Sequence, residues 1–111
     1  MRKIAVNMVV RIPENAVSNH QVIGISEDGF CISCTRLEEE TAETEWLSGI
    51  IILAPLNVSR ENGENFQRMV KRLCLMSANI ELIKGCKAYL VSPFDIAKMS
   101  FVDDSCIFLL K

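Results

Sequence analysis

Residues 50–54, with the sequence Ile-Ile-Ile-Leu-Ala, constrain the fold of this 111-residue chain more than any other feature. The run is apolar without interruption, and Gly49 and Pro55 flank it. A short, mostly β-branched run between chain breakers is typical of a strand that is buried on both faces. Such a strand needs cover on both sides, so the remaining elements must supply it.

The segment after this run predicts a loop and then an amphipathic helix, because apolar side chains recur at helical spacing between polar ones. The apolar side of the helix consists of Phe66, Met69, Val70, Leu73 and Ser77. We expect the helix over about residues 60–78, with Ser59 or Asn62 capping its start and Asn79 ending it. A short strand over residues 80–83 would complete a central β-α-β unit, whose crossover is long enough for parallel pairing.

The segments before this unit predict further strands. Residues 4–12 alternate between two sides, which predicts a half-buried strand. Its apolar side consists of Ile4, Val6, Met8, Val10 and Ile12. Residues 21–26 and 30–37 predict a hairpin, since the Asp28-Gly29 pair between them tolerates the positive φ angles of a tight turn.

Less regular segments predict shorter elements. Residues 38–47 favour a short exposed helix, and Ser92-Pro93 favours the start of another that ends near Met99. Strands are expected over residues 86–91 and 106–110, with a turn at residues 103–105 before the last one.

These elements predict a single compact α+β domain over residues 1–111, with a mixed sheet of about six or seven strands. The long helix is expected on one face of the sheet, and one or two short helices elsewhere. The alternative is an α/β three-layer arrangement.

Composition argues against nucleic-acid and membrane partners. The net charge is −2, which gives no general attraction to a polyanion. The basic residues of the predicted helix lack interleaved aromatic residues, and Glu61 and Glu64 interrupt them, so a solvated helix face is favoured. No apolar run is long enough to span a bilayer, and the first residues do not match a signal peptide. We therefore expect a cytoplasmic protein with reduced cysteines.

The cysteines do not predict a metal site or a redox pair. Cys31 and Cys34 have the C-x-x-C spacing of half a zinc site or a redox dithiol. Residues three apart on a regular strand point to opposite faces, so these thiols should not converge. There is no second C-x-x-C, His20 is the only histidine, and the other three cysteines lie among apolar neighbours. No metal, cofactor or disulfide is predicted.

No set of residues predicts catalysis. His20 lies in a polar turn and has no identifiable partner to orient it as a base. The carboxylate pairs Glu27-Asp28 and Asp103-Asp104 lie in predicted turns, where such groups are normally solvated. The sequence therefore favours a protein that is not an enzyme, with no catalytic residues.

An acidic run is harder to explain as scaffold, because its charges repel one another. It consists of Glu38, Glu39, Glu40, Glu43 and Glu45. Trp46 and Leu47 follow it directly. This pattern predicts a contact surface for a partner with a basic surface, with Trp46 as an apolar anchor. The alternative is a solvated acidic helix whose Trp46 packs on the sheet.

The loop after residues 50–54 is a candidate ligand site, because ligands bind beyond the carboxyl ends of strands in parallel sheets. Its polar residues are Asn57, Ser59, Arg60, Asn62 and Asn65. Glu61 and Glu64 would repel a phosphate there. The alternative is an ordinary capped connection.

The expected function is a small non-catalytic protein-binding module of the inhibitor, immunity or adaptor type, acting through the acidic surface and Trp46. One alternative is a small ligand-binding domain or enzyme with a pocket at the loop after residue 54. Another is a self-associating subunit, in which residues 107–110 pair across a homodimer from a sheet edge.

Overall fold

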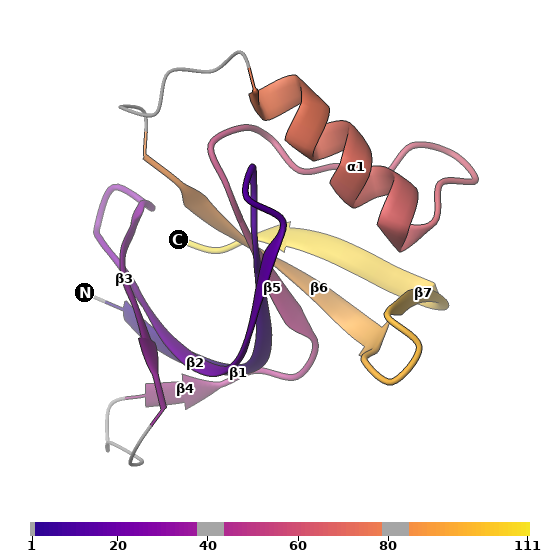
Figure 1. The fold of residues 1–111 in the computed structure, drawn as a ribbon. Coiled ribbons are helices and arrows are strands. Elements are labelled where there is room, and N and C mark those ends of the chain that lie inside the picture. Colours follow the sequence, from indigo (N-terminus) through magenta and orange to yellow (C-terminus); the bar gives the residue numbers. More distant parts are fainter. Residues whose placement is uncertain (1, 38–43, 79–84) are drawn as a thin grey trace.

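Seven strands form one mixed sheet, and a helix packs against one of its faces (Figure 1). The computed structural model describes residues 2–37, 44–78 and 85–111. The elements in chain order are β1 (Arg2–Arg11), β2 (Ala16–Ile25), β3 (Cys31–Arg36), β4 (Thr44–Trp46), β5 (Ile50–Ala54), α1 (Phe66–Ser77), β6 (Lys87–Asp95) and β7 (Ser100–Leu109). The strand order is β3-β2-β1-β5-β6-β7, and β4 pairs separately with β1.

β5 lies at the centre of the sheet, and the prediction that it is buried on both faces is confirmed. Ile50, Ile52 and Ala54 belong to the core cluster beneath α1. Ile51 and Leu53 belong to a second cluster on the opposite face. β1 is the parallel neighbour of β5, and β6 is its antiparallel neighbour. The strand expected over residues 80–83 lies outside the described residues.

β1 is buried on both faces, so the prediction of a half-buried strand is wrong. Ala5 and Val9, expected on the more polar side, are 0% exposed, as is Ile4. The reason is that both core clusters include β1: Val10 lies in the cluster beneath α1, and Ile4, Val6 and Val9 lie in the second cluster. Along its edges, β1 pairs with β2 on one side, and with β4 and then β5, both parallel to it, on the other.

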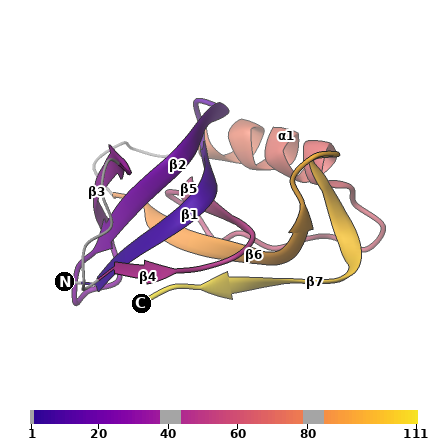
Figure 2. The ribbon, with the colours of Figure 1, turned by 90° about the horizontal axis from the view of Figure 1, so that it is seen from below.

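The sheet curls until β3 returns to contact β6, and Figure 2 shows this curvature. Phe30 forms an antiparallel bridge with Lys87, and the Cys31 N–H donates to the Cys86 carbonyl at 2.8 Å. Strands β3, β2, β1, β5 and β6 therefore surround the second core cluster like a small barrel. This cluster contains Ile4, Val6, Val9, Ile23, Ile25, Ile51, Leu53, Ala88 and Leu110.

The predicted hairpin is confirmed as β2 and β3. Gly29 closes its turn with φ 85°, a left-handed conformation in which glycine has no Cβ clash. The β4–β5 junction also requires a glycine. A Cβ on Gly49, whose φ is 104°, would overlap the Val91 carbonyl oxygen.

α1 begins later than predicted and ends one residue earlier, at Ser77. Its first residue is Phe66, and the Asn65 side chain accepts from the Arg68 N–H at 2.8 Å. Neither Ser59 nor Asn62 is therefore the cap. The apolar side was predicted correctly, since all five of its residues are buried.

Three shorter predictions are wrong where the structure describes them. Residues 44–46 form β4 rather than helix, because they pair in parallel with β1, while residues 38–43 lie outside the described part. Ser92-Pro93 does not start a helix. β6 continues to Asp95, and a register shift between Ser92 and Phe94 places Pro93, which has no N–H to donate, at an irregularity in the ladder. Asp103 lies within β7, not in a turn.

The chain thus forms a single compact domain with a seven-stranded mixed sheet and, in the described residues, one helix on one face. The additional short helices and the two-sided cover of a three-layer arrangement are not seen in this part of the chain. The Cα radius of gyration of 13.4 Å is the value expected of a compact domain of this length. Within the same residues, no helix has the length and apolar character needed to cross a membrane.

Candidate binding groove

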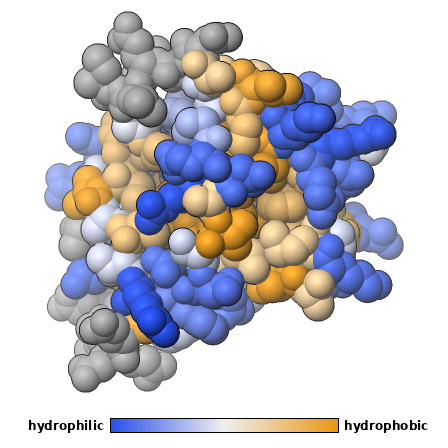
Figure 3. Space-filling view, in the orientation of Figure 1, coloured by the Kyte–Doolittle hydropathy of each residue, from blue (hydrophilic) through white to orange (hydrophobic). Residues whose placement is uncertain are grey.

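An apolar groove separates α1 from the turn between β1 and β2, and its volume is about 520 Å³. Figure 3 shows apolar surface gathered between the helix and this turn, bordered by polar side chains. The groove is lined by Val10, Pro13, Asn15, Val17, Phe66, Gln67, Val70, Lys71, Cys74 and Met99. These residues come from the first hairpin, from one side of α1 and from the β6–β7 turn.

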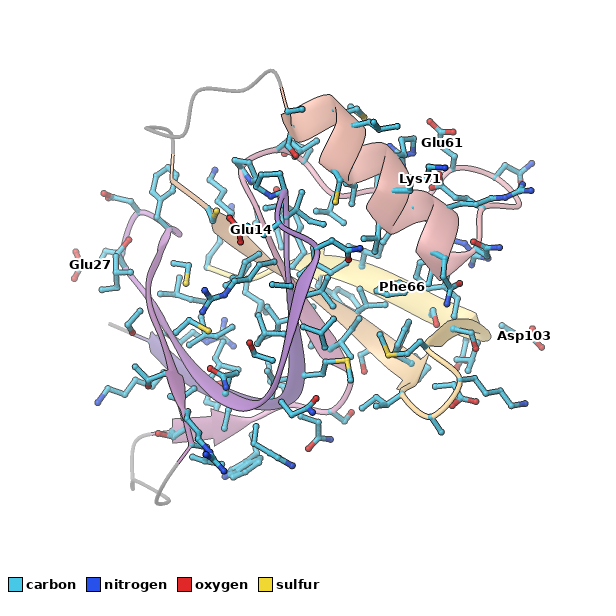
Figure 4. All side chains as sticks on the ribbon, viewed as in Figure 1. Glu14, Glu27, Glu61, Phe66, Lys71 and Asp103 are labelled. Atoms are coloured by element: carbon cyan, nitrogen blue, oxygen red, sulfur yellow. The ribbon has the colours of Figure 1, made fainter. Side chains whose placement is uncertain are left out.

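The helix wall of the groove is held in place by aromatic packing. Phe66 lies between α1 and the sheet (Figure 4), with its ring centroid 4.8 Å from that of Phe94 and 5.7 Å from that of Phe101. Both pairs meet edge to face, a favourable arrangement for aromatic rings. The Gln67 amide also donates to the Met99 carbonyl at 2.8 Å, which ties the β6–β7 turn to the helix.

The opposite wall is the end of the β1–β2 hairpin. Asn15 has φ 54°, a left-handed conformation that Asn tolerates better than most residues. Val17 follows on β2 and leaves 51% of its surface exposed. The groove therefore has a tight turn and an exposed apolar side chain on this side.

Lys71 is the charged residue that lines the groove, while burial, and to a smaller extent the nearby Glu14 carboxylate, raises the pKa of Cys74. Among its described lining residues, Lys71 is the only one with a formal charge, and no carboxylate lines the groove. The Cys74 thiol is held neutral, because burial raises its pKa. An apolar concavity with one placed charged group is typical of a binding site. Its complement is an apolar group that carries an acid.

The five residues of the predicted loop site do not line this groove. Arg60 stacks on the Phe101 ring, 4.2 Å from its centroid, and its Nε donates to the Glu64 carbonyl at 2.6 Å. Asn65 caps α1. Asn57 accepts from the Tyr89 hydroxyl at 3.2 Å and lines a smaller cavity of about 400 Å³.

The same loop is held in place by a partly buried ion pair. Both carboxylate oxygens of Glu64 accept from Arg72, at 2.8 Å each, and Glu64 is only 9% exposed. Arg72 also donates to the Ser59 carbonyl at 2.6 Å, while Asn62 is exposed. Hydrogen bonding to Arg72 is the main reason that the pKa of Glu64 falls to about 2. Four of the five predicted loop residues or their backbone groups thus make contacts inside the protein.

The predicted acidic surface is described only at its end. Glu38, Glu39, Glu40 and Glu43 lie outside the described residues. Glu45 is exposed and receives two hydrogen bonds from Arg2, at 2.9 and 3.0 Å, which lower its pKa. Trp46 on β4 is 50% exposed, whereas Leu47 packs against the second core cluster.

Cys31 and Cys34 do converge, contrary to the sequence prediction. Cys34 pairs with Ile23 and Cys31 with Ile25, so the register shifts by one residue between them. This β-bulge inserts an extra residue and turns both thiols to the same side. Both pack against the second core cluster and line one cavity.

The remaining candidates for chemistry stay separate. His20 is exposed on β2, and Asp103 and Asp104 are exposed on β7. In the described part of the chain, no three His, Cys, Asp or Glu residues are grouped so that they could hold a metal ion.

The groove was not predicted from the sequence. The available signal was Cys74, four residues after Val70, which widens the apolar side of the helix beyond the residues that face the core. No protein-family model matches the sequence, and no curated protein or solved structure shows significant similarity to it.

Proposed function

We propose that this protein is a non-catalytic binding protein whose groove takes an apolar segment of another protein that carries an acidic side chain. The observation that carries the proposal is the groove itself, about 520 Å³ and mainly apolar, with Lys71 as the one charged residue among the described residues that line it. A cation beside an apolar concavity favours an acidic group on the partner and disfavours a basic one.

A protein partner is favoured over a small metabolite by the apolar surface around the groove. Leu75, one helical turn after Lys71, is 66% exposed, and Val17 is 51% exposed on the opposite wall. An extended apolar surface with a polar rim is characteristic of protein contacts. The lining residues also offer no pairing of a nucleophile with a base, since Lys71 and the neutral Cys74 are the only reactive groups.

A displayed library of random 12-residue peptides tests this proposal, with wild-type protein as the bait. We expect enrichment of peptides that combine apolar residues with Asp or Glu, and that lose binding to the Lys71→Glu and Val17→Glu variants. Lys71 and Val17 are exposed, so neither change disturbs the core. The matched control is Arg36→Glu, which makes the same charge reversal at an exposed site on β3 away from the groove. Peptides that bind all three variants equally would contradict the assignment to the groove.

The acidic run with Trp46 is a second candidate surface for a partner, and its half-exposed indole supports it. Replacing Glu38, Glu39, Glu40, Glu43 and Glu45 together by Gln should slow association with a basic protein partner by about tenfold at low salt. Stopped-flow measurement of the association rate checks this. An unchanged rate would remove the acidic run from the interface.

The predicted loop site and self-association remain predictions. β7 is the last strand of the sheet, and its Phe108 and Leu109 are 49% and 40% exposed. This placement is compatible with pairing between two copies, but Asp103 and Asp104 on the same strand disfavour edge-to-edge pairing.

A further inference from the structure

Three cysteines line one cavity at the end of the barrel, on the other side of the β1–β2 turn from the binding groove. The cavity has a volume of about 370 Å³. Cys31, Cys34 and Cys86 contribute thiols to it, and Arg11 and Glu14 line it from the β1–β2 region. All three thiols are free. The Arg11 Nε atom is buried there without a hydrogen-bond partner among the described residues.

Two of these cysteines stand directly opposite each other across the seam that closes the barrel. Phe30 pairs with Lys87 in an antiparallel bridge, so the next residue on each side brings Cys31 opposite Cys86. The Cys31 N–H donates to the Cys86 carbonyl at 2.8 Å, which is one of the two bonds that a hydrogen-bonded antiparallel pair exchanges. The Cα atoms of directly opposite residues in an antiparallel ladder are about 4.5–5.5 Å apart. Disulfides span Cα separations of roughly 4.4–6.8 Å, so this spacing accommodates one.

The side chains of this pair also face the same space. Cys31 and Cys86 both pack against the second core cluster and both line the cavity. Cys34 is the competing partner for Cys31, and its thiol donates to the Gln21 Oε1 atom at 3.5 Å. Cys31 and Cys34 lie on one strand, opposite Ile25 and Ile23, which are separated by about 6.7 Å along β2. This separation is at the upper end of the range that a disulfide spans, so the pair across the seam is favoured.

We propose that Cys31 and Cys86 form a reversible disulfide that locks the barrel seam when the protein meets a small-molecule disulfide such as oxidised glutathione. One thiolate attacks a sulfur of the oxidant, forming a mixed disulfide and releasing one glutathione thiolate, which takes up the proton lost by the cysteine. The second thiolate then attacks the protein sulfur of the mixed disulfide and releases the second glutathione. Two protein thiols are oxidised to one disulfide, and one glutathione disulfide is reduced to two thiols.

Burial slows the formation of this disulfide. The pKa of each thiol is raised, mainly because burial disfavours the thiolate, so exchange with a small-molecule disulfide is expected to be slow. In the described part of the chain, the contacts across this seam include the Phe30–Lys87 bridge, the Cys31–Cys86 backbone hydrogen bond and the Lys87 Nζ atom 5.2 Å from the Phe30 ring centroid. A covalent link at this point joins segments far apart in sequence, and it would restrict the unfolded chain strongly.

The test uses glutathione buffers of graded ratio and two matched variants. One retains Cys31 and Cys86 (Cys34→Ser, Cys74→Ser, Cys106→Ser), and the other retains Cys31 and Cys34 (Cys74→Ser, Cys86→Ser, Cys106→Ser). After alkylation of free thiols, mass spectrometry measures the fraction of each pair that is bonded. We expect the Cys31/Cys86 pair to oxidise at a ratio of oxidised to reduced glutathione at least tenfold lower than the other pair. Its Tm should rise by about 5–15 °C on oxidation.

Peptide mapping of the oxidised wild-type protein gives a second measurement that does not depend on the folding of either variant. A Cys31–Cys86 crosslinked peptide is expected. Recovery of a Cys31–Cys34 crosslink instead, or of glutathione adducts without an internal disulfide, would overturn the proposal.

Discussion

At the scale of single residues, Glu64 has a structural role that the sequence did not predict, because it pairs with Arg72. From the sequence, Glu64 was a helix-start acid that would repel an anion. In the structure it lies just before α1, with its carboxylate bound by Arg72 one to two turns along the helix. The same carboxylate also accepts a hydrogen bond from the Glu61 N–H at 3.1 Å, within the loop. The pair folds the loop back onto the helix.

Replacing Glu64 by Gln should therefore destabilise the protein. The drop of its pKa from 4.5 to about 2 corresponds to about 3 kcal/mol, and solvent screening reduces the expected loss to about 1–2 kcal/mol. Urea denaturation at pH 7 measures it. The control is Glu61→Gln, because Glu61 is exposed and its contact with Arg72 is longer, at 3.6 Å; it should cost about 0.5 kcal/mol or less.

The pH dependence of this variant follows from the sign of the shift. A carboxyl whose folded pKa is depressed stabilises the fold above its unfolded pKa, here about 4.5, and loses that contribution as the pH falls towards about 2. The stability difference between wild type and Glu64→Gln should thus be largest above pH 5 and shrink in acid. A difference that stays constant from pH 7 to pH 2.5 would contradict a charged Glu64 in the pair.

At the scale of elements, the predictions that held are those whose signals are local. The apolar run of β5, the Asp28-Gly29 turn and the apolar side of α1 each carry their own pattern and breakers. The predictions that were wrong concern segments whose structure depends on pairing with strands elsewhere in the sequence. β4 is a strand because β1 offers it a free edge, and β6 runs on through Pro93 because β7 pairs with it around an irregularity.

The burial of β5 on both faces predicts how much stability a truncated side chain there should cost. Ile51 is 0% exposed in the second core cluster, so Ile51→Ala should lose about 3–4 kcal/mol of unfolding free energy through lost burial and a residual cavity. Ile32→Ala makes the same chemical change at a strand position that is 59% exposed, and it should cost about 0.5 kcal/mol or less. Equal losses in urea denaturation would show that β5 is not the shared centre of both cores.

At the scale of the whole molecule, the groove and the cysteine cavity could not be predicted, because each assembles residues from separate parts of the chain. The groove combines the β1–β2 hairpin, α1 and Met99. The cysteine cavity exists because the sheet curls and a β-bulge turns Cys31 and Cys34 to one side. Neither the curl of the sheet nor the β-bulge has a signature in the local pattern of apolar and polar residues. That pattern did predict a sheet of about six or seven strands with one long helix.

The turn between β1 and β2 connects the two sites. Pro13 and Asn15 line the groove, while Arg11 and Glu14 line the cysteine cavity (Figure 4 labels Glu14). The proposed partner contact and the proposed disulfide thus lie on opposite sides of one turn, and each can be tested with the other left intact.

The most direct test of the account is a charge swap across the groove, measured by isothermal titration calorimetry with the best peptide from the library selection. We predict that Lys71→Glu weakens binding about tenfold, that Arg36→Glu leaves it unchanged, and that replacing the acid of the peptide by Lys restores affinity for the Lys71→Glu variant. If Lys71→Glu binds the original peptide as tightly as wild type does, the groove is not the binding site.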